Sequence, residues 1–423
     1  MLGGYGWGVS SAAPTDEIDE PIPLLTPRDG LPAVIVSAPE LAAVTARFDA
    51  GTGPVAVDAE RASGYRYGQR AYLVQLRRRG AGTTIIDPIA CPDLGRLGTA
   101  IAETEWVLHA AGQDLPCLAE IGMAPHRLFD TELAGRLLGY QRVGLGTIVE
   151  EVLGYRLEKG HSAVDWSTRP LPEPWLHYAA LDVEVLIELR DALEAELRAT
   201  GKLDWAHQEF AAIAAAPTPP PRRDPWRRTS GIHRVRRPRQ LAVVRELWLA
   251  RDRVAQQRDL SPGRVLPDAA IIEAAIQQPA SKSRLTALPA FTARGPRRDL
   301  DQWWAAITAA SRLAEDALPD PSPAAEGPPP ARSWPDRDPV AAERLTALRA
   351  AVAAIADEHN LPTENLLAPD TVRRLAWQPP PDLSAGSIGG FLTEHGARPW
   401  QRDQTAKVLA KALVRHRTKE SAG

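Results

Sequence analysis

Four carboxylates and one tyrosine in the first half of the chain have types and spacings that suit phosphodiester chemistry. They lie in three short motifs, VDAE at 57–60, HAAGQDL at 109–115 and YAALD at 178–182. Acids that converge in one pocket repel one another unless cations neutralise them. Carboxylate oxygens suit Mg²⁺ or Mn²⁺, and two such ions about 3.5–4 Å apart commonly serve phosphodiester hydrolysis. The motifs therefore favour a metal-dependent nuclease.

The first motif ends an apolar run and carries two acids, Asp58 and Glu60, separated by one residue. On a strand, residues two apart point to the same face. This pattern is typical of a buried strand that presents ligands at its tip. The alternative interpretation is a pair of exposed acids at a strand end.

The other two motifs place acids at helices. Asp114 follows a short apolar run and precedes a helical pattern, which alone is equally typical of a helix N-cap. Tyr178 and Asp182 are four residues apart, so they share one face of a helix. The alternative is a packed tyrosine beside a solvated acid. Leu181 and Val183 flank Asp182 in an otherwise apolar segment, which argues against simple solvation.

Composition limits the classes of protein that the chain can belong to. Its 423 residues exceed one ordinary domain, and 44% hydrophobic residues suffice for real cores. The net charge of −3 excludes a general polycation, so any nucleic-acid surface must be local. Cys91 and Cys117 form neither a disulfide framework nor zinc spacing. The N-terminus lacks a signal peptide, and no apolar stretch approaches the roughly 20 residues of a membrane span. We expect a cytoplasmic protein that makes no membrane contact.

Proline-rich breaks divide the chain. We expect a disordered segment at 1–30, an α/β domain at 31–213 and helical domains at 234–317 and 337–416. The intervening segments, 214–233 and 318–336, are predicted to be extended linkers, of which the first is basic.

The first domain alternates strand and helix patterns. Strands are predicted at 55–58, 71–76, 83–87 and 106–109, and helices at 94–103, 115–121, 130–138, 147–153 and 174–199. This order predicts an α/β domain with a mixed sheet. The two helical regions resemble each other, because 253–275 and 354–376 share helix, turn and Pro-Asp patterns. Either the region is duplicated or two small bundles share turn chemistry by chance.

In combination, the three motifs resemble the DEDD exonuclease superfamily, in the subtype with a tyrosine four residues before the last aspartate. The stretch LEKGHSAVDWSTRPL at 157–171, leading into WLHYAALDVEVLIEL at 175–189, is similar to the ribonuclease D family. The resemblance covers 31–199 and implies a ribonuclease H-like sheet. Residues 235–314 resemble the HRDC domain, and the resemblance implies that 337–416 is a second, diverged copy.

The resemblance also implies roles for the motif residues. Asp58 would bridge two divalent ions, Mg²⁺ or Mn²⁺, Glu60 and Asp182 would complete the first metal site, and Asp114 would help to hold the second. Tyr178 would orient the attacking water, because a phenol with a pKa near 10 is a poor base at neutral pH. The product would be a nucleoside 5′-monophosphate released from a 3′ end.

Further residues are candidates for substrate contact. Lys159 and His161 precede the third motif in a loop that is otherwise expected to be solvated. Gln75 is expected to face the substrate from the second strand. Trp166 and Arg169 are expected to pack and brace the loop, and Arg169 is also counted among the substrate-binding candidates.

An arginine-rich run follows the α/β domain. Residues 222–239 hold eight arginines and one aspartate, with Trp226 among them. Arginine forks bind phosphates and aromatic rings stack on bases, so Trp226, Arg227 and Arg228 are candidates for RNA contact. The alternative is a solvated basic linker in a chain that is rich in arginine throughout.

The motifs and the resemblance together predict a 3′–5′ exoribonuclease. The resemblance implies that its substrate is structured RNA with a single-stranded 3′ tail, such as a tRNA precursor, and a monomer is the default expectation. Two alternatives stay open. The motifs do not separate RNA from DNA, because no residue can be shown from sequence to read a 2′-hydroxyl. A catalytically silent RNA-binding adaptor on a nuclease fold is the second alternative, although all four acids and the tyrosine are present.

Overall fold

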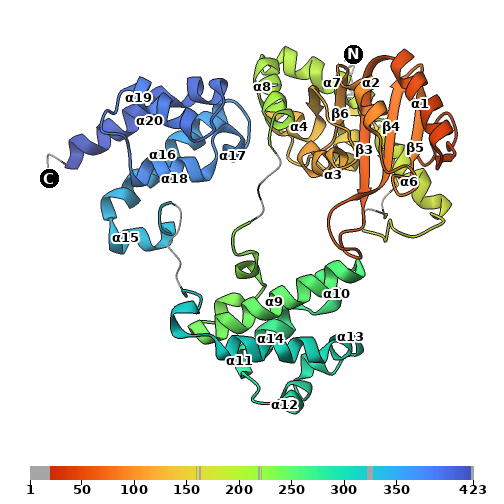
Figure 1. The fold of residues 1–423 in the computed structure, drawn as a ribbon. Helices are drawn as coiled ribbons and strands as arrows, with labels where there is room; N and C mark the ends of the chain where they lie inside the picture. The colour runs from red at the N-terminus through yellow and green to blue at the C-terminus, as the bar shows by residue number, and fades with distance from the viewer. Residues whose placement is uncertain are drawn as a thin grey trace, which may run out of the picture.

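The computed structural model describes residues 20–158, 160–161, 163–217, 220, 222–321 and 327–420. These residues form three parts, an α/β part that contains the sheet and two helical parts, α9–α14 and α15–α20 (Figure 1). Among the described helices, none combines the length and apolar character that a membrane crossing requires.

The α/β part is built on a six-stranded mixed sheet. Its strands, in spatial order, are β2 (Val34–Ile35), β5 (Gly82–Ile86), β4 (Ala71–Arg79), β3 (Thr52–Arg61), β6 (Glu105–Leu108) and β7 (Arg127–Asp130). Strand β4 is antiparallel to both β3 and β5, whereas β2, β6 and β7 pair in parallel. The predicted α/β class with a mixed sheet is confirmed.

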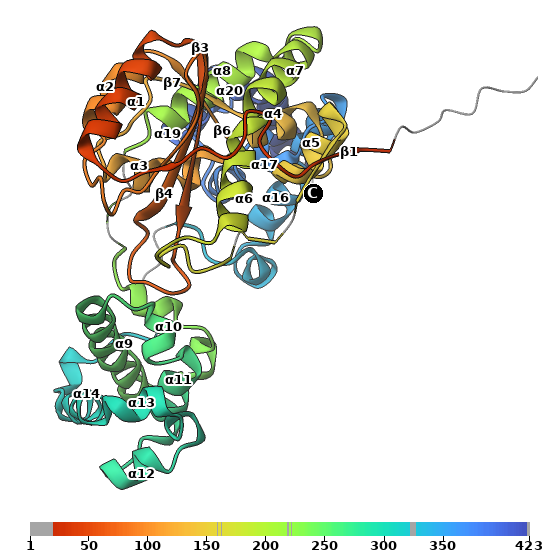
Figure 2. The ribbon, with the colours of Figure 1, turned by 90° about the vertical axis from the view of Figure 1, so that its right-hand side faces the viewer.

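Helices cover both faces of this sheet. Helices α1 (Ala38–Ala50) and α2 (Gly95–Ile101) lie on one face, and α6 (Glu173–Glu184) and α7 (Leu186–Ala199) lie on the other (Figure 2). Helix α6 packs across β3, β4 and β5. The remaining helices of this part are α3 (Leu115–Ala119), α4 (Thr131–Leu138), α5 (Leu145–Leu153) and α8 (Leu203–Ala214).

Two predictions for this part are wrong. The single helix expected at 174–199 is two helices, which meet at the buried residue Val185, where a φ of −98° and a ψ of −12° interrupt the regular helix. The break allows α6 to cross one half of the sheet and α7 the other. The prediction that 1–30 is disordered is wrong for part of this segment, because β1 (Ile22–Leu24) pairs in parallel with β8 (Tyr155–Leu157). Residues 1–19 lie outside the described residues.

The second part is a bundle with its own core. Its helices are α9 (Pro238–Arg258), α10 (Pro262–Val265), α11 (Asp268–Gln277), α12 (Lys282–Thr286), α13 (Arg294–Arg298) and α14 (Leu300–Arg312). Buried apolar side chains from Trp226 to Ala310 pack together, with Phe291 and Trp303 completely buried. The predicted linker at 214–233 is therefore wrong beyond Pro225, where two short 3₁₀ turns begin and Trp226 joins this core.

The third part docks on the α/β part. Its helices are α15 (Trp334–Arg337), α16 (Pro339–Glu358), α17 (Thr363–Leu366), α18 (Pro369–Trp377), α19 (Ala385–Glu394) and α20 (Pro399–Glu420). The indole of Trp400 stacks on that of Trp205 from α8 at 4.6 Å. Lys202 donates hydrogen bonds to the carbonyl oxygens of Leu137 (2.6 Å) and His359 (2.5 Å), which lie on opposite sides of this interface. Burial of that ammonium lowers the pKa of Lys202.

Candidate active site

Strand β3 carries the first two acids at the end of a buried run. Val55, Ala56 and Val57 are completely buried, and Asp58 and Glu60 follow on one face of the strand. Asp58 lies opposite Gln75 and Glu60 lies opposite Leu73 on β4. Because β3 lies between β4 and β6, the position of the two carboxylates on the sheet is fixed from both sides.

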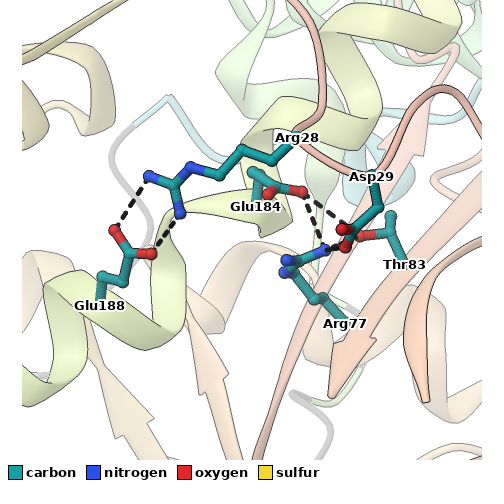
Figure 3. Close-up of polar contacts among 6 residues, drawn as sticks. All are labelled: Arg28, Asp29, Arg77, Thr83, Glu184 and Glu188. Atoms are coloured by element: carbon teal, nitrogen blue, oxygen red, sulfur yellow. Dashed lines mark hydrogen bonds and ion pairs between the residues drawn. The ribbon is translucent and has the colours of Figure 1, made fainter. Parts of the chain in front are cut away.

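Helix α6 brings the other motif residues over the same face. It contacts β3, β4 and β5, so Tyr178 and Asp182 stand above the two acids of β3. Glu184 fixes the end of the helix, because its carboxylate forms an ion pair with the guanidinium of Arg77 on β4 at 3.0 Å. Figure 3 shows Arg77 between Glu184 and Asp29. The side chain of Glu184 is completely inaccessible, so this pair stands between helix and sheet.

Asp114 reaches the site from the segment that follows β6, the strand next to β3. It lies between a 3₁₀ turn (Ala111–Gln113) and α3, and its side chain makes no capping hydrogen bond. Asp114 therefore occupies the N-cap position of α3, as the alternative interpretation expected, but its side chain does not cap the helix. The turn is held by Asp130, which accepts hydrogen bonds from the backbone N–H groups of Ala110 (3.1 Å) and Ala111 (2.8 Å). Ala110 has a φ of 59°, a left-handed conformation that such bonds help to maintain.

Three of the four acids come together. Oxygen atoms of Asp58, Glu60 and Asp182 all lie within 4.8 Å of one another. Asp114 lines the same cleft, which has a volume of about 520 Å³. Tyr178, His109, Gly144, Gly146 and Glu158 complete much of its wall. The described residues thus place the five predicted catalytic side chains around one cleft.

Burial and mutual repulsion hold these carboxyls in an unusual electrostatic state. Burial raises the pKa of Asp58 to about 6. Burial, and then the nearby charge of Asp58, raise the pKa of Asp114 to about 8. The pKa values of Glu60 and Asp182 are also raised, again by burial first and by neighbouring acids second. A site of this kind attracts cations, because a cation removes both penalties.

One residue of the cleft was missed from the sequence. Arg61 lies 3.3 Å from Asp114 in an ion pair, and among the described lining residues it is the only arginine or lysine. A regular strand would point Arg61 away from Glu60. The pairing of β3 with β4 shifts its register between these two residues, so the alternation is not maintained there. One guanidinium does not balance four carboxylates.

Tyr178 is surrounded by aromatic side chains. Its ring meets that of His161 edge to face at 5.7 Å and lies 6.4 Å from the buried indole of Trp166. Burial, followed by the charge of Asp182, raises the pKa of Tyr178 above its usual range. The phenol is therefore a hydrogen-bond donor at neutral pH and not a base. His161, a substrate-binding candidate, is placed against this ring and outside the residues that line the cleft.

Two other candidates from the sequence are placed away from the cleft. Gln75 is completely buried beneath α6, and its amide has no hydrogen-bond partner among the described residues. The prediction that it faces the substrate is wrong. Arg169 binds the carboxylate of Asp87 at 2.6 and 2.9 Å and the carbonyl oxygen of Tyr72 at 2.7 Å, so it braces the loop, as expected. Lys159 lies outside the described residues.

The arginine-rich run divides into buried and exposed members. Trp226 is 3% exposed, and its indole N–H donates to Asp224 at 3.1 Å. It therefore offers no ring face to a base, which corrects the stacking prediction. Arg227 lies over that indole at 4.3 Å and pairs with Asp224. Arg228 is exposed, as are Arg222, Arg223, Arg234, Arg236 and Arg237.

Models of three protein families match the chain. Residues 33–198 match the 3′–5′ exonuclease model, residues 240–307 match the HRDC domain and residues 327–413 match the 3′ to 5′ exonuclease C-terminal domain. The first match contains all four acids and Tyr178. The last match covers the helices from α15 to most of α20.

Curated relatives cover most of the chain. Ribonuclease D of Nitrobacter hamburgensis is 31% identical over 315 residues, which are 73% of this chain and 78% of that protein. Ribonuclease D of Pseudomonas paraeruginosa is 30% identical over 341 residues, covering 78% of this chain and 84% of that one.

Solved structures show the same arrangement. The structure of a protein from Bifidobacterium adolescentis matches with a TM-score of 0.87 at 37% identity. This match covers 93% of the present chain and 100% of that protein. Escherichia coli RNase D, described as an exoribonuclease involved in structured RNA processing, has a TM-score of 0.67 at 26% identity. This match covers 90% of the present chain and 98% of RNase D.

Proposed function

The chain belongs to the ribonuclease D family and is a 3′–5′ exoribonuclease, and we propose that it trims structured RNA with two divalent metal ions. The observation that supports this most is the cluster of Asp58, Glu60 and Asp182, whose oxygen atoms lie within 4.8 Å of one another. Asp114 and Tyr178 line the same cleft. This is a donor set of hard oxygen atoms, which fits Mg²⁺ or Mn²⁺.

The residues that would hold the ions follow from their places in the cleft. Asp58 would serve both ions, Glu60 and Asp182 would complete the first site, and Asp114 would help to hold the second. Divalent cations bound there would acidify water and neutralise charge on the phosphate. The raised pKa values of the four carboxyls fit this assignment, because they reflect burial first and, for Glu60, Asp114 and Asp182, the charge of neighbouring acids second, and a bound cation would offset both.

Tyr178 would position the attacking water. Its phenol stays protonated at neutral pH, so it can donate a hydrogen bond to the water oxygen but cannot remove the proton. The water oxygen forms a bond to phosphorus and the bond from phosphorus to the 3′ oxygen breaks. The leaving 3′ oxygen takes up a proton, and the products are a nucleoside 5′-monophosphate and RNA shortened by one nucleotide.

The helical parts would hold the RNA body. Six exposed arginines between Arg222 and Arg237 lie between the α/β part and the bundle, where they can bind phosphates. We propose a tRNA precursor, or a similar folded RNA with a single-stranded 3′ tail, as the substrate. The buried, free state of Cys91 and Cys117 is compatible with work in the reducing cytoplasm.

We also propose that residues 337–416 are a diverged second copy of the HRDC-like bundle, with domains at 31–213, 234–317 and 337–416. Helices α9, α10 and α11 have 21, 4 and 10 residues, and α16, α17 and α18 have 20, 4 and 9. The same succession of lengths supports duplication. The family model that matches this region is nevertheless the exonuclease C-terminal domain.

The substrate class can be tested by direct competition. A tRNA precursor with a 3′ tail, an unstructured RNA and a DNA of the same tail sequence would be compared at equal concentration in Mg²⁺. We expect the highest kcat/KM for the tailed precursor and shortening that stops near the folded body. Equal rates on matched RNA and DNA would favour a DNA exonuclease, and RNA binding without shortening would favour an adaptor.

A further inference from the structure

The hairpin that joins β3 to β4 leaves the sheet directly beyond the acids of β3. It comprises residues 62–70 and extends to the second part, where it meets α9 and α10 (Figures 1 and 2). Surface hairpins of this length are mobile unless other elements hold them. The contacts at its tip therefore determine how well the hairpin is ordered.

Arg264 of α10 makes the central contact. Its Nε donates to the carbonyl oxygen of Gly64 at 2.8 Å, and its guanidinium lies 4.2 Å over the ring of Tyr65. Next to it, the backbone N–H of Ser261 donates to the carbonyl oxygen of Tyr65 at 3.0 Å. A planar guanidinium suits this combination of a directed hydrogen bond and a stacked ring, which an ammonium does not reproduce.

Two side-chain contacts with α9 and its C-terminal cap flank this centre. The hydroxyl of Tyr67 donates to Asp252 at 3.1 Å, and the Tyr67 ring packs against the core of the bundle. Arg70 pairs with Asp259 at 2.7 Å, an exposed pair that adds little by itself. The bundle therefore holds the hairpin at three successive points.

The other side of the hairpin faces the nuclease site. Tyr65 donates through its hydroxyl to the carbonyl oxygen of Ala163, and Arg66 donates to Ser167 at 2.7 Å, both in the loop before α6. Between hairpin and loop lies a cleft of about 330 Å³ that includes Glu60 and Arg61 in its wall. Tyr65 thus connects the bundle, which covers its ring, with the loop that leads to Tyr178.

We propose that Arg264 is a positioning residue for the nuclease reaction and acts through Tyr65 on the wall of this cleft. The inference rests on the proposed function, because it assigns the bundle a part in that reaction. It differs from the expectation that the bundle only holds RNA. Pre-ordering a wall next to the reacting groups raises kcat without adding any contact between Arg264 and RNA.

A short substrate separates the two roles. A trinucleotide leaves almost no RNA for the helical parts to bind. We expect Arg264→Ala to lower kcat on the trinucleotide about tenfold, a modest misplacement effect, while Mn²⁺ binding measured by calorimetry stays unchanged. Arg264→Lys should behave like Arg264→Ala, and in a Tyr65→Leu background Arg264→Ala should have little further effect. Arg253→Ala, which removes an exposed arginine of α9 outside these contacts, is the matched control and should keep the trinucleotide rate.

Hydrogen exchange provides a readout that does not depend on activity. In the full-length protein, amides of residues 62–70 should exchange at least several-fold faster in Arg264→Ala, while those of α14 stay unchanged. Unchanged exchange of the hairpin, or an unchanged trinucleotide kcat with a higher KM on long RNA, would overturn the proposal. A wild-type protein without activity on any RNA would instead overturn the proposed function, and the exchange result would still decide whether Arg264 orders the hairpin.

Discussion

The guanidinium of Arg61 at the end of β3 lies 3.3 Å from the carboxylate of Asp114 at the start of α3. Asp114 is the proposed ligand of the second metal ion. Arg61 thus stands where a divalent cation would compete for the same charge. It also lines both the main cleft and the smaller one beside the hairpin at 62–70. We therefore expect it to pair with an RNA phosphate when a cation binds Asp114.

This arrangement predicts opposite effects on metal and RNA. Arg61→Gln should bind Mn²⁺ more tightly in the absence of RNA, by roughly fivefold for about 1 kcal/mol of removed repulsion. The same variant should show a higher KM for RNA, because one phosphate partner is lost. Calorimetry with Mn²⁺ and steady-state kinetics measure the two effects separately. Weaker metal binding by Arg61→Gln would show that Arg61 helps to build the site and does not compete with the ion.

The raised carboxyl pKa values predict that the metal-free protein becomes less stable as pH rises. Aspartates in an unfolded chain titrate near pH 4, whereas Asp58 titrates at about 6 and Asp114 at about 8 in the folded protein. Between pH 4 and 8 the folded state therefore binds more protons than the unfolded state, and its stability falls as pH increases.

Thermal melting in EDTA from pH 5 to pH 8 measures this contribution. Asp58→Asn should melt at a higher temperature than the wild type at pH 8 in EDTA, and the difference should shrink toward pH 5. Mg²⁺ should stabilise the wild type more at pH 8 than at pH 5, because it binds the deprotonated carboxylates. A wild type that gains stability over this range relative to Asp58→Asn would contradict the assignment of the raised pKa values.

The ion pair of Arg77 and Glu184 should be important for the stability of the α/β part. Glu184 is buried, and its removal leaves Arg77, which is 19% exposed, with only the exposed Asp29 as an ion-pair partner among the described residues. Glu184→Gln should lower the free energy of unfolding by roughly 3 kcal/mol. Because Glu184 is two residues from Asp182 on α6, metal affinity should fall as well.

Glu188→Gln is the matched control in the same view (Figure 3). Glu188 pairs with Arg28, but both side chains are substantially exposed, so the change should be below about 1 kcal/mol. Urea denaturation of both variants measures the difference. Equal losses would show that the Arg77 pair has no special part in fixing α6.

Tyr178→Phe should separate positioning from binding. The ring keeps its contacts with His161 and Trp166, but the hydroxyl that would orient the water is lost. We expect kcat to fall on the order of 10²-fold with KM and metal affinity nearly unchanged. A Tyr178→Phe enzyme with wild-type kcat, measured on the same 5′-labelled RNA, would remove the tyrosine from the reaction.

The sequence predicts those parts of the site that depend on local periodicity. Asp58 and Glu60 follow the alternation of a strand, and Tyr178 and Asp182 follow the turn of a helix, so their common faces could be derived from spacing alone. The strand order and the parallel partners of β3 could not be derived, because they depend on contacts between distant segments. The resemblance to a known family implied a ribonuclease H-like sheet, and the order and pairing of its strands come from the structure.

The failures have physical reasons. Arg61 was missed because the irregular pairing at Glu60 breaks the alternation on which the argument relied. Trp226 was misplaced because the surrounding arginines hide a single buried ring within a polar run. Strand β7 was missed because its four residues pass directly into α4, at the N-cap Asp130, which suggests only a helix. The short aspartate-threonine signal before α4 could have identified Asp130 as a cap, but not its second set of hydrogen bonds to Ala110 and Ala111.

The most direct test of the central claim follows the length of a 5′-labelled RNA with a single-stranded 3′ tail. Wild type, Asp58→Asn and the surface control Glu103→Gln would each be incubated in Mg²⁺ and in EDTA. We predict stepwise shortening from the 3′ end with release of nucleoside 5′-monophosphates, in Mg²⁺ only and for wild type and Glu103→Gln only. Equal shortening by Asp58→Asn, or shortening that persists in EDTA, would contradict a metal-dependent site built on the acids of β3, α3 and α6.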